Sequence, residues 1–146
     1  MSKVRSSRAS TTTSAYAHHM RKPLTSRAAS AVGPYSHGIV SDPFVVLSGQ
    51  TPLDASTGEL VGGGVSAQTR KCFANLFAVL ADAGLDASDV VKVNVYLTDM
   101  RDFDAMNDAY AEHFDEPYPA RTTVGVAALP LGAVVEIELM ARRRGD

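Results

Sequence analysis

One arginine stands where its side chain could hold an anion. Arg121 follows a Tyr-Pro-Ala triplet at 118–120 and opens a run of residues that predicts a strand. Because the ring of Pro119 restricts the backbone just before it, the guanidinium leaves the chain in a defined direction. An arginine held in this way can grip a carboxylate through two parallel, charge-assisted hydrogen bonds. The alternative is an ion pair with one of the sixteen acidic residues, and the residue count alone favours the ion pair.

Two glutamates lie two residues apart in an alternating segment. Glu136 and Glu138 alternate with Val135, Ile137 and Leu139. In a strand, side chains alternate between the two faces, so both carboxylates point away from the apolar face. Such a face is either covered by water or buried against another molecule. In the second case the pKa of one carboxylate would rise, and that group could exchange protons near neutral pH.

The other reactive side chains form no recognisable catalytic or metal-binding motif. Cys72 is the only cysteine and lies on the apolar stripe of a predicted helix, where burial suppresses its thiolate. His37 and His113 stand apart from each other, and Gly62–Gly64 lacks the Lys-Ser/Thr pair of a phosphate-binding loop. The sequence therefore predicts an inert core cysteine and no metal site.

The elements that must position Arg121 and Glu136 follow from apolar periodicity. Residues 39–40 and 44–48 predict two short strands joined by a turn at 41–43. Residues 49–64 are rich in Gly and Pro and predict a long loop, with one short strand near Leu60. Apolar residues at spacings of three and four predict a helix over 66–83, which ends at Gly84.

The second half of the domain continues with strands around another helix. Residues 90–97 are rich in β-branched residues and predict a buried strand. Asp102 is expected to cap a helix that runs through Phe114 and ends before Pro117. Strands are expected at 122–126 and 134–141, separated by a turn at 129–132.

This order of elements predicts an α+β fold with an uncovered sheet face. Two helices cannot cover both faces of so large a sheet, so we expect them to pack on one side. The other face then needs a partner, and a second copy of the chain is the natural candidate.

Composition sets the outer limits of the prediction. The chain has 146 residues, which fits one domain, and is 45% hydrophobic, which argues against disorder throughout. No apolar run reaches the roughly 18 residues of a membrane span.

Residues 1–27 contain six basic and no acidic residues, so we expect a basic disordered extension there and a folded domain over 28–146. An organelle transit peptide or a cloning remnant is an alternative for the extension, and the expected localisation is otherwise cytoplasmic.

The folded domain is acidic, which disfavours a nucleic-acid partner. Residues 28–146 hold eight basic and sixteen acidic residues. Binding to a phosphate backbone depends on clustered Lys and Arg that release counterions. Only the basic extension and the cluster Arg142–Arg144 could supply such a patch.

Short motifs spread along the domain resemble those of the RidA (YjgF) family, whose members also carry the name endoribonuclease L-PSP. The similarity covers essentially residues 29–143. The matching segments occur in the family's order: 33–36 (GPYS), 48–53 (SGQTPL), 57–59 (TGE), 68–70 (QTR), 75–76 (NL), 95–100 (VYLTDM), 102–103 (DF), Asn107, 119–121 (PAR) and 135–138 (VEIE).

The resemblance implies a chorismate-mutase-like protomer that assembles as a homotrimer, with the sheets forming a central barrel and the active sites lying between subunits. It implies hydrolysis of reactive 2-imino or 2-enamino acids, of the 2-iminobutanoate/2-iminopropanoate type, to 2-oxo acids and ammonia. No cofactor is implied.

The resemblance also assigns roles to individual residues. Arg121 would bind the substrate carboxylate, and Glu136 would hold or activate the attacking water. The backbones of Gly49 and Thr123 would line the pocket, and Tyr35 would close one wall. Asn107, on the second helix, would lie at the rim of the pocket.

One departure from the family pattern leaves alternatives open. Archetypal deaminases commonly carry Cys two residues after the arginine, and this chain carries Thr123. If the position acts through its backbone, threonine is tolerated; if the thiol itself acts, activity falls or specificity changes. The alternatives to an imine deaminase are a deaminase of a bulkier, aminomuconate-like enamine and a non-catalytic trimer that binds a ligand or RNA.

Overall fold

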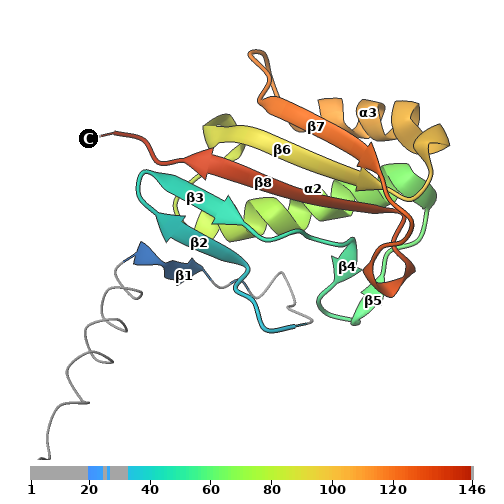
Figure 1. Ribbon diagram of the computed structural model, residues 1–146, viewed down its shortest axis with the longest axis horizontal. Coiled ribbons are helices and arrows are strands. Elements are labelled where there is room, and N and C mark those ends of the chain that lie inside the picture. Colours follow the sequence, from blue (N-terminus) through green and yellow to red (C-terminus); the bar gives the residue numbers. More distant parts are fainter. Residues whose placement is uncertain (1–19, 25, 27–32, 146) are drawn as a thin grey trace, which may run out of the picture.

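A six-stranded mixed sheet forms the centre of the protein in the computed structural model, which describes residues 20–24, 26 and 33–145 (Figure 1). The strand order is β1-β2-β3-β8-β6-β7, and the β6–β7 pair alone is parallel. A separate two-stranded ribbon is made by β4 and β5. The strands are β1 (Lys22–Leu24), β2 (Gly38–Ser41), β3 (Phe44–Leu47), β4 (Leu53–Asp54), β5 (Glu59–Leu60), β6 (Val90–Leu97), β7 (Ala120–Gly125) and β8 (Val135–Arg142).

Two α-helices pack on one face of this sheet, as the element order predicts (Figure 1). They are α2 (Gly64–Asp82) and α3 (Phe103–Ala111), and short 3₁₀ turns lie at Ala87–Asp89, Met100–Asp102 and Pro130–Gly132. The α2 helix ends where Gly84 adopts a positive φ of 73°, so the predicted glycine stop is confirmed. None of the helices in the described residues combines the length and apolar character that a membrane crossing requires.

The start of α3 differs from the expectation that Asp102 caps it. Asp102 already has helical dihedral angles and its side chain makes no capping hydrogen bond. Asp99 is the last extended residue, and its carboxylate accepts a hydrogen bond from the N–H of Arg101 at 2.9 Å. Asp99 therefore caps the 3₁₀ turn that leads into α3. The helix also ends at Ala111, before the expected Phe114.

Strand β1 is a second difference, because the sequence predicts no strand before residue 28. Lys22–Leu24 pairs antiparallel with β2, and Leu24 lies opposite Gly38. Because Gly38 has no side chain, the buried side chain of Leu24 fits over it, near Leu47. Residues 1–19, 25, 27–32 and 146, which include most of the expected extension, lie outside the described residues.

The two faces of the sheet differ in character. On β8, Val135, Ile137, Leu139 and Ala141 are buried against the helices, and the intervening residues point to the opposite, open face. The open face carries polar groups on β6 and β8 together with exposed apolar side chains. Exposed apolar residues on its strands include Phe44, Val46 and Val124.

Aromatic packing fixes α3 against α2. The ring of Phe73 on α2 is fully buried and lies 5.5 Å from Tyr110, 4.5 Å from His113 and 5.5 Å from Phe114, measured between ring centroids. Ring pairs in this range add to the stabilisation from apolar burial. The position of α3, and of every side chain it carries toward the sheet, therefore depends on Phe73.

Replacing Phe73 by alanine is expected to lower the free energy of unfolding by about 3–5 kcal/mol, because it leaves a cavity between the helices. The same change at Phe77, whose ring is only half-buried, is the matched control and should cost less. Urea denaturation at fixed protein concentration measures both. Equal losses at the two positions would contradict the role given to Phe73.

Candidate active site

Arg121 belongs to β7, and its half-buried side chain lies between this strand and α3. It pairs with Val93 in the parallel β6–β7 ladder, and Val93 points into the core, so Arg121 lies on the helix side of the sheet. Its guanidinium carbon lies 4.7 Å from the ring centre of Tyr110 and 5.7 Å from that of Phe103. At these distances the rings attract the guanidinium without using its N–H groups, which stay able to bind an anion.

No acidic side chain of the described residues forms an ion pair with Arg121. The ion-pair interpretation that the residue count favours is therefore not what the structure shows. Arg121 is instead a cation held by aromatic rings, and this geometry fits the alternative interpretation, a carboxylate-binding group.

Three buried polar atoms beside Arg121 lack a hydrogen-bond partner among the described residues. They are Oδ1 of Asn107, the hydroxyl of Tyr110 and Oγ1 of Thr123. Asn107 and Tyr110 lie three residues apart on α3, and Thr123 follows Arg121 by two on the same face of β7. An unsatisfied buried polar group costs about 1–3 kcal/mol, so this cluster is suited to a polar ligand.

Tyr110 keeps its proton in this setting. Burial raises the pKa of its phenol, and the positive charge of Arg121 opposes that change only in part. The neutral phenol can both donate and accept a hydrogen bond.

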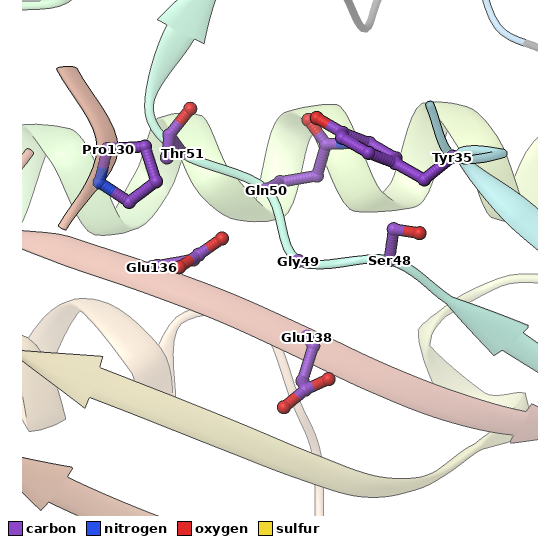
Figure 2. A pocket seen from close by; sticks show the side chains of 8 residues that line it. All are labelled: Tyr35, Ser48, Gly49, Gln50, Thr51, Pro130, Glu136 and Glu138. Carbon is purple, nitrogen blue, oxygen red and sulfur yellow. The ribbon is translucent and has the colours of Figure 1, made fainter. Parts of the chain in front are cut away.

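A second group of polar residues lines a cavity of about 390 Å³ at the end of β3 and along β8 (Figure 2). Tyr35 and Pro130 stand at opposite ends of the cavity in Figure 2, and the Ser48–Thr51 segment runs between them. The lining residues are Tyr35, Ser48, Gly49, Gln50, Thr51, Pro130, Glu136 and Glu138.

The carboxyl group of Glu136 packs directly against the backbone of Gly49. A Cβ atom at Gly49 would lie 2.7 Å from Oε1 of Glu136, closer than such atoms approach. Gln50 anchors the same segment, because its N–H donates to the carbonyl of Ile137 at 2.8 Å and its carbonyl accepts from the N–H of Ile137 at 3.2 Å. Glycine at position 49 is therefore what allows this segment and Glu136 to meet.

The electrostatic setting of Glu136 favours its protonated form. Burial is the larger cause that raises the pKa of its carboxyl group above the usual value, and the charge of Glu138 is the second. The sequence predicts such a rise only if a second subunit covers the face, whereas one chain alone already produces it.

The structure does not bring Arg121 and Glu136 together within one chain. Glu136 pairs with Tyr96, whose side chain points to the open face, while Arg121 pairs with Val93 on the helix face. The predicted site residues therefore form two clusters. One cluster contains Arg121, Thr123 and Asn107, and the other contains Glu136, Gly49 and Tyr35.

Sequence reasoning missed the aromatic support of Arg121. Phe103, Asn107 and Tyr110 occur at positions i, i+4 and i+7 of α3, which is the signal of one helix face. Only the packing of α3 against β7 shows that this face meets Arg121. Tyr96, whose hydroxyl donates a hydrogen bond to Glu138, was also missed.

The cysteine belongs to the core, as expected. Cys72 is fully buried, its thiol lies 3.2 Å from the carbonyl of Gln50, and burial raises its pKa strongly. The ring of His113 stacks on Phe73. Within the described part of the chain, no group of three or more His, Cys, Asp or Glu side chains is placed to hold a metal ion.

Comparison with known proteins gives consistent matches over this fold. A family model described as Endoribonuclease L-PSP matches residues 25–143. The 2-iminobutanoate/2-iminopropanoate deaminase of Capra hircus is 43% identical over 117 residues, which are 80% of this chain and 85% of that protein.

Two solved structures show the same architecture. RidA from an Antarctic Psychrobacter species has a TM-score of 0.80 and 43% identity, and the match covers 84% of this chain and 99% of that one. The structure of E. coli TdcF with bound serine has a TM-score of 0.80 and 38% identity, and the match covers 84% and 99% of the two chains.

A Gly49→Ala substitution is expected to turn the carboxyl group of Glu136 away from the Ser48–Thr51 segment. The atom nearest the new methyl group is the end of a flexible side chain, so the fold should tolerate the change with a loss of about 1 kcal/mol or less. A crystal structure of the variant and its urea denaturation curve test both parts. An unmoved Glu136 carboxyl group would contradict the close packing described here.

Proposed function

This chain belongs to the endoribonuclease L-PSP family, also called the RidA family, and from this premise we propose that it hydrolyses reactive 2-imino or 2-enamino acids. The products are 2-oxo acids and ammonia, and no cofactor takes part. Relatives that carry the name imine deaminase support an enzymatic role. The proposal for this chain rests on the chemistry of its two residue clusters.

The guanidinium of Arg121, which forms no ion pair within the described part of the chain, is the observation that carries the proposal. A 2-imino acid presents a carboxylate next to its C=N bond, and two N–H groups of Arg121 can bind that carboxylate in parallel. Asn107 and Tyr110 on α3 and Thr123 on β7 carry buried polar atoms without a partner among the described residues, and these atoms can bond the remaining polar groups. The bound serine in the related TdcF structure, also an amino acid carboxylate, supports a ligand of this class.

Thr123 occupies the position where archetypal deaminases commonly carry cysteine. Its hydroxyl oxygen is buried and unpartnered, so it can take part in substrate binding as a hydrogen-bonding group. The position therefore keeps a polar contact without a thiol. We propose that Thr123 lines the substrate site through its backbone and its hydroxyl group.

We propose that the complete site forms between two copies of the chain. Arg121 and Glu136 lie on opposite faces of the sheet, so one copy cannot offer both to one small substrate. The open face exposes Phe44, Val46 and Val124, which are 38%, 45% and 40% exposed, and such apolar side chains favour burial against another subunit. A homotrimer with sites between neighbouring subunits fits these requirements.

In this arrangement Glu136 of one copy faces the substrate held by Arg121 of the next. Glu136 accepts a proton from water while the water oxygen forms a bond to the C=N carbon. The proton is then delivered to the nitrogen, which gives a carbinolamine. Transfer of the hydroxyl proton to the same nitrogen lets the C–N bond break, and ammonia leaves as the C=O bond of the 2-oxo acid forms. The imine carbon is already electrophilic, so holding the substrate and moving two protons to its nitrogen are the tasks left to the protein.

The Arg121→Ala variant tests the proposal. Wild-type protein added to a threonine dehydratase reaction is expected to speed the release of 2-oxobutanoate and ammonia. Loss of two charge-assisted hydrogen bonds of roughly 1.5–3 kcal/mol each should lower kcat/KM of the variant by about 10²- to 10⁴-fold.

Arg101→Ala is the matched control, because the Arg101 side chain is 91% exposed and pairs only with Asp99 among the described residues. It should retain full activity. A wild-type protein that gives no acceleration over buffer would contradict imine hydrolysis. A bulkier enamine acid assayed in parallel tests the aminomuconate-like alternative.

A further inference from the structure

A tyrosine and a second glutamate stand beside Glu136 on the open face of the sheet. Glu138 follows Glu136 by two residues on β8, and both line the same cavity. Tyr96 on β6 lies directly opposite Glu136 in the antiparallel ladder. Its hydroxyl reaches diagonally past Glu136 and donates a hydrogen bond to Oε1 of Glu138.

This hydrogen bond gives Glu138 a fixed direction. In Figure 2 the side chain of Glu138 points toward β6, where Tyr96 lies, while that of Glu136 points toward Gly49. The hydrogen bond to Glu138 is the main cause that raises the pKa of Tyr96 to about 12. The phenol therefore keeps its proton throughout the physiological range and remains a donor to Glu138.

Few other titratable groups face Glu136 among the described residues. Tyr35 approaches from the segment before β2, and the buried thiol of Cys72 lies toward α2. The Ser48–Thr51 segment and Pro130 bring no charged side chain to the cavity. Lys92, the basic side chain on the same face of β6, donates to Oγ1 of Thr122 instead. Glu138 is thus the charged group that acts on Glu136.

We propose that Tyr96 and Glu138 are positioning residues, which hold a carboxylate charge beside Glu136 and so set the pH at which Glu136 binds its proton. The inference rests on the proposed function, because only the deaminase mechanism makes Glu136 a proton acceptor. A like charge disfavours the ionised form of a neighbouring carboxyl group, so Glu138 makes Glu136 a stronger base. A base of higher pKa accepts a proton from water more readily, provided that it is still ionised at the working pH.

The Glu138→Gln variant removes the charge and keeps an oxygen that can accept the hydrogen bond of Tyr96. The titration midpoint of the Glu136 carboxyl carbon, measured by ¹³C NMR on the full chain and assigned with Glu136→Gln, is expected to fall by about 0.5 pH unit. The acid limb of the kcat/KM profile should move to lower pH by the same amount. Glu112→Gln, which removes a carboxylate paired with Arg70 instead, is the control and should move neither.

A second measurement tests the tyrosine contact directly. In a Glu138→Ala variant, which removes both the hydrogen-bond acceptor and the charge, the pKa of Tyr96 should move from about 12 toward 10. Tyrosinate absorbance at pH 10.5, corrected with Tyr96→Phe, should then show a larger ionised fraction of this residue in Glu138→Ala than in the wild type. An equal ionised fraction in the two proteins would overturn the contact.

The outcomes separate this inference from the proposed function. If the wild type is active but Glu138→Gln moves neither the acid limb nor the titration midpoint of Glu136, the inference is overturned and imine hydrolysis still stands. A downward shift of the Glu136 midpoint in a protein without deaminase activity supports the charge coupling and contradicts the proposed function.

Discussion

The alternation of side chains across a β-sheet is the constraint on which the account of this protein depends. Arg121 belongs to the face that packs against α3, and Glu136 belongs to the open face, because their ladder partners Val93 and Tyr96 alternate in the same way. A change of register by one residue would reverse both faces, but it would also expose the buried side chains of β6 and β8. The same burial that stabilises the domain therefore separates the two groups that the proposed reaction needs.

Arg121 and Glu136, the two halves of the proposed site, are each held in place by packing on their own side of the sheet. On the helix side, Phe73 holds α3 in place, and α3 supplies the rings that support Arg121. On the open side, the contact of Gly49 with Glu136 leaves the carboxyl group half-buried, and burial raises its pKa. Neither half contains both the anion-binding group and the proton acceptor. In the proposed function, assembly of two copies is the step that completes the site.

Much of the fold could be predicted from the sequence, because its elements are periodic and clearly bounded. The strand at 90–97 and the glycine stop of α2 lie where the pattern predicts them. Asp102 was mistaken for a cap because Asp99 and Asp102 are both good capping residues, and only the dihedral angles distinguish them. Strand β1 was missed because Lys22–Leu24 is short, and its pairing with β2 is a tertiary contact that local composition does not encode.

The candidate site could be predicted less completely. Arg121 and Glu136 were identifiable by residue type and spacing, but the aromatic support from Tyr110 and the contact of Tyr96 with Glu138 depend on how separate elements pack. Residue counts even favoured an ion pair for Arg121, because counting acids takes no account of which face each one occupies. The alternation of apolar and polar residues within β6 and β8 predicts which side chains share a face of the sheet. The face of Arg121 follows only once the pairing of β7 with β6 is known.

Complementation between two inactive variants tests the central claim most directly. Arg121→Ala and Glu136→Gln each remove one half of the site, and neither should hydrolyse the imine alone. Mixed oligomers, made by co-expressing differently tagged copies and purifying through both tags, contain some interfaces that combine an intact Arg121 with an intact Glu136. In a mixed trimer selected through both tags, one interface in three carries this combination, so we expect about a third of wild-type activity. Mixed oligomers no more active than the separate variants would contradict a site shared between two copies.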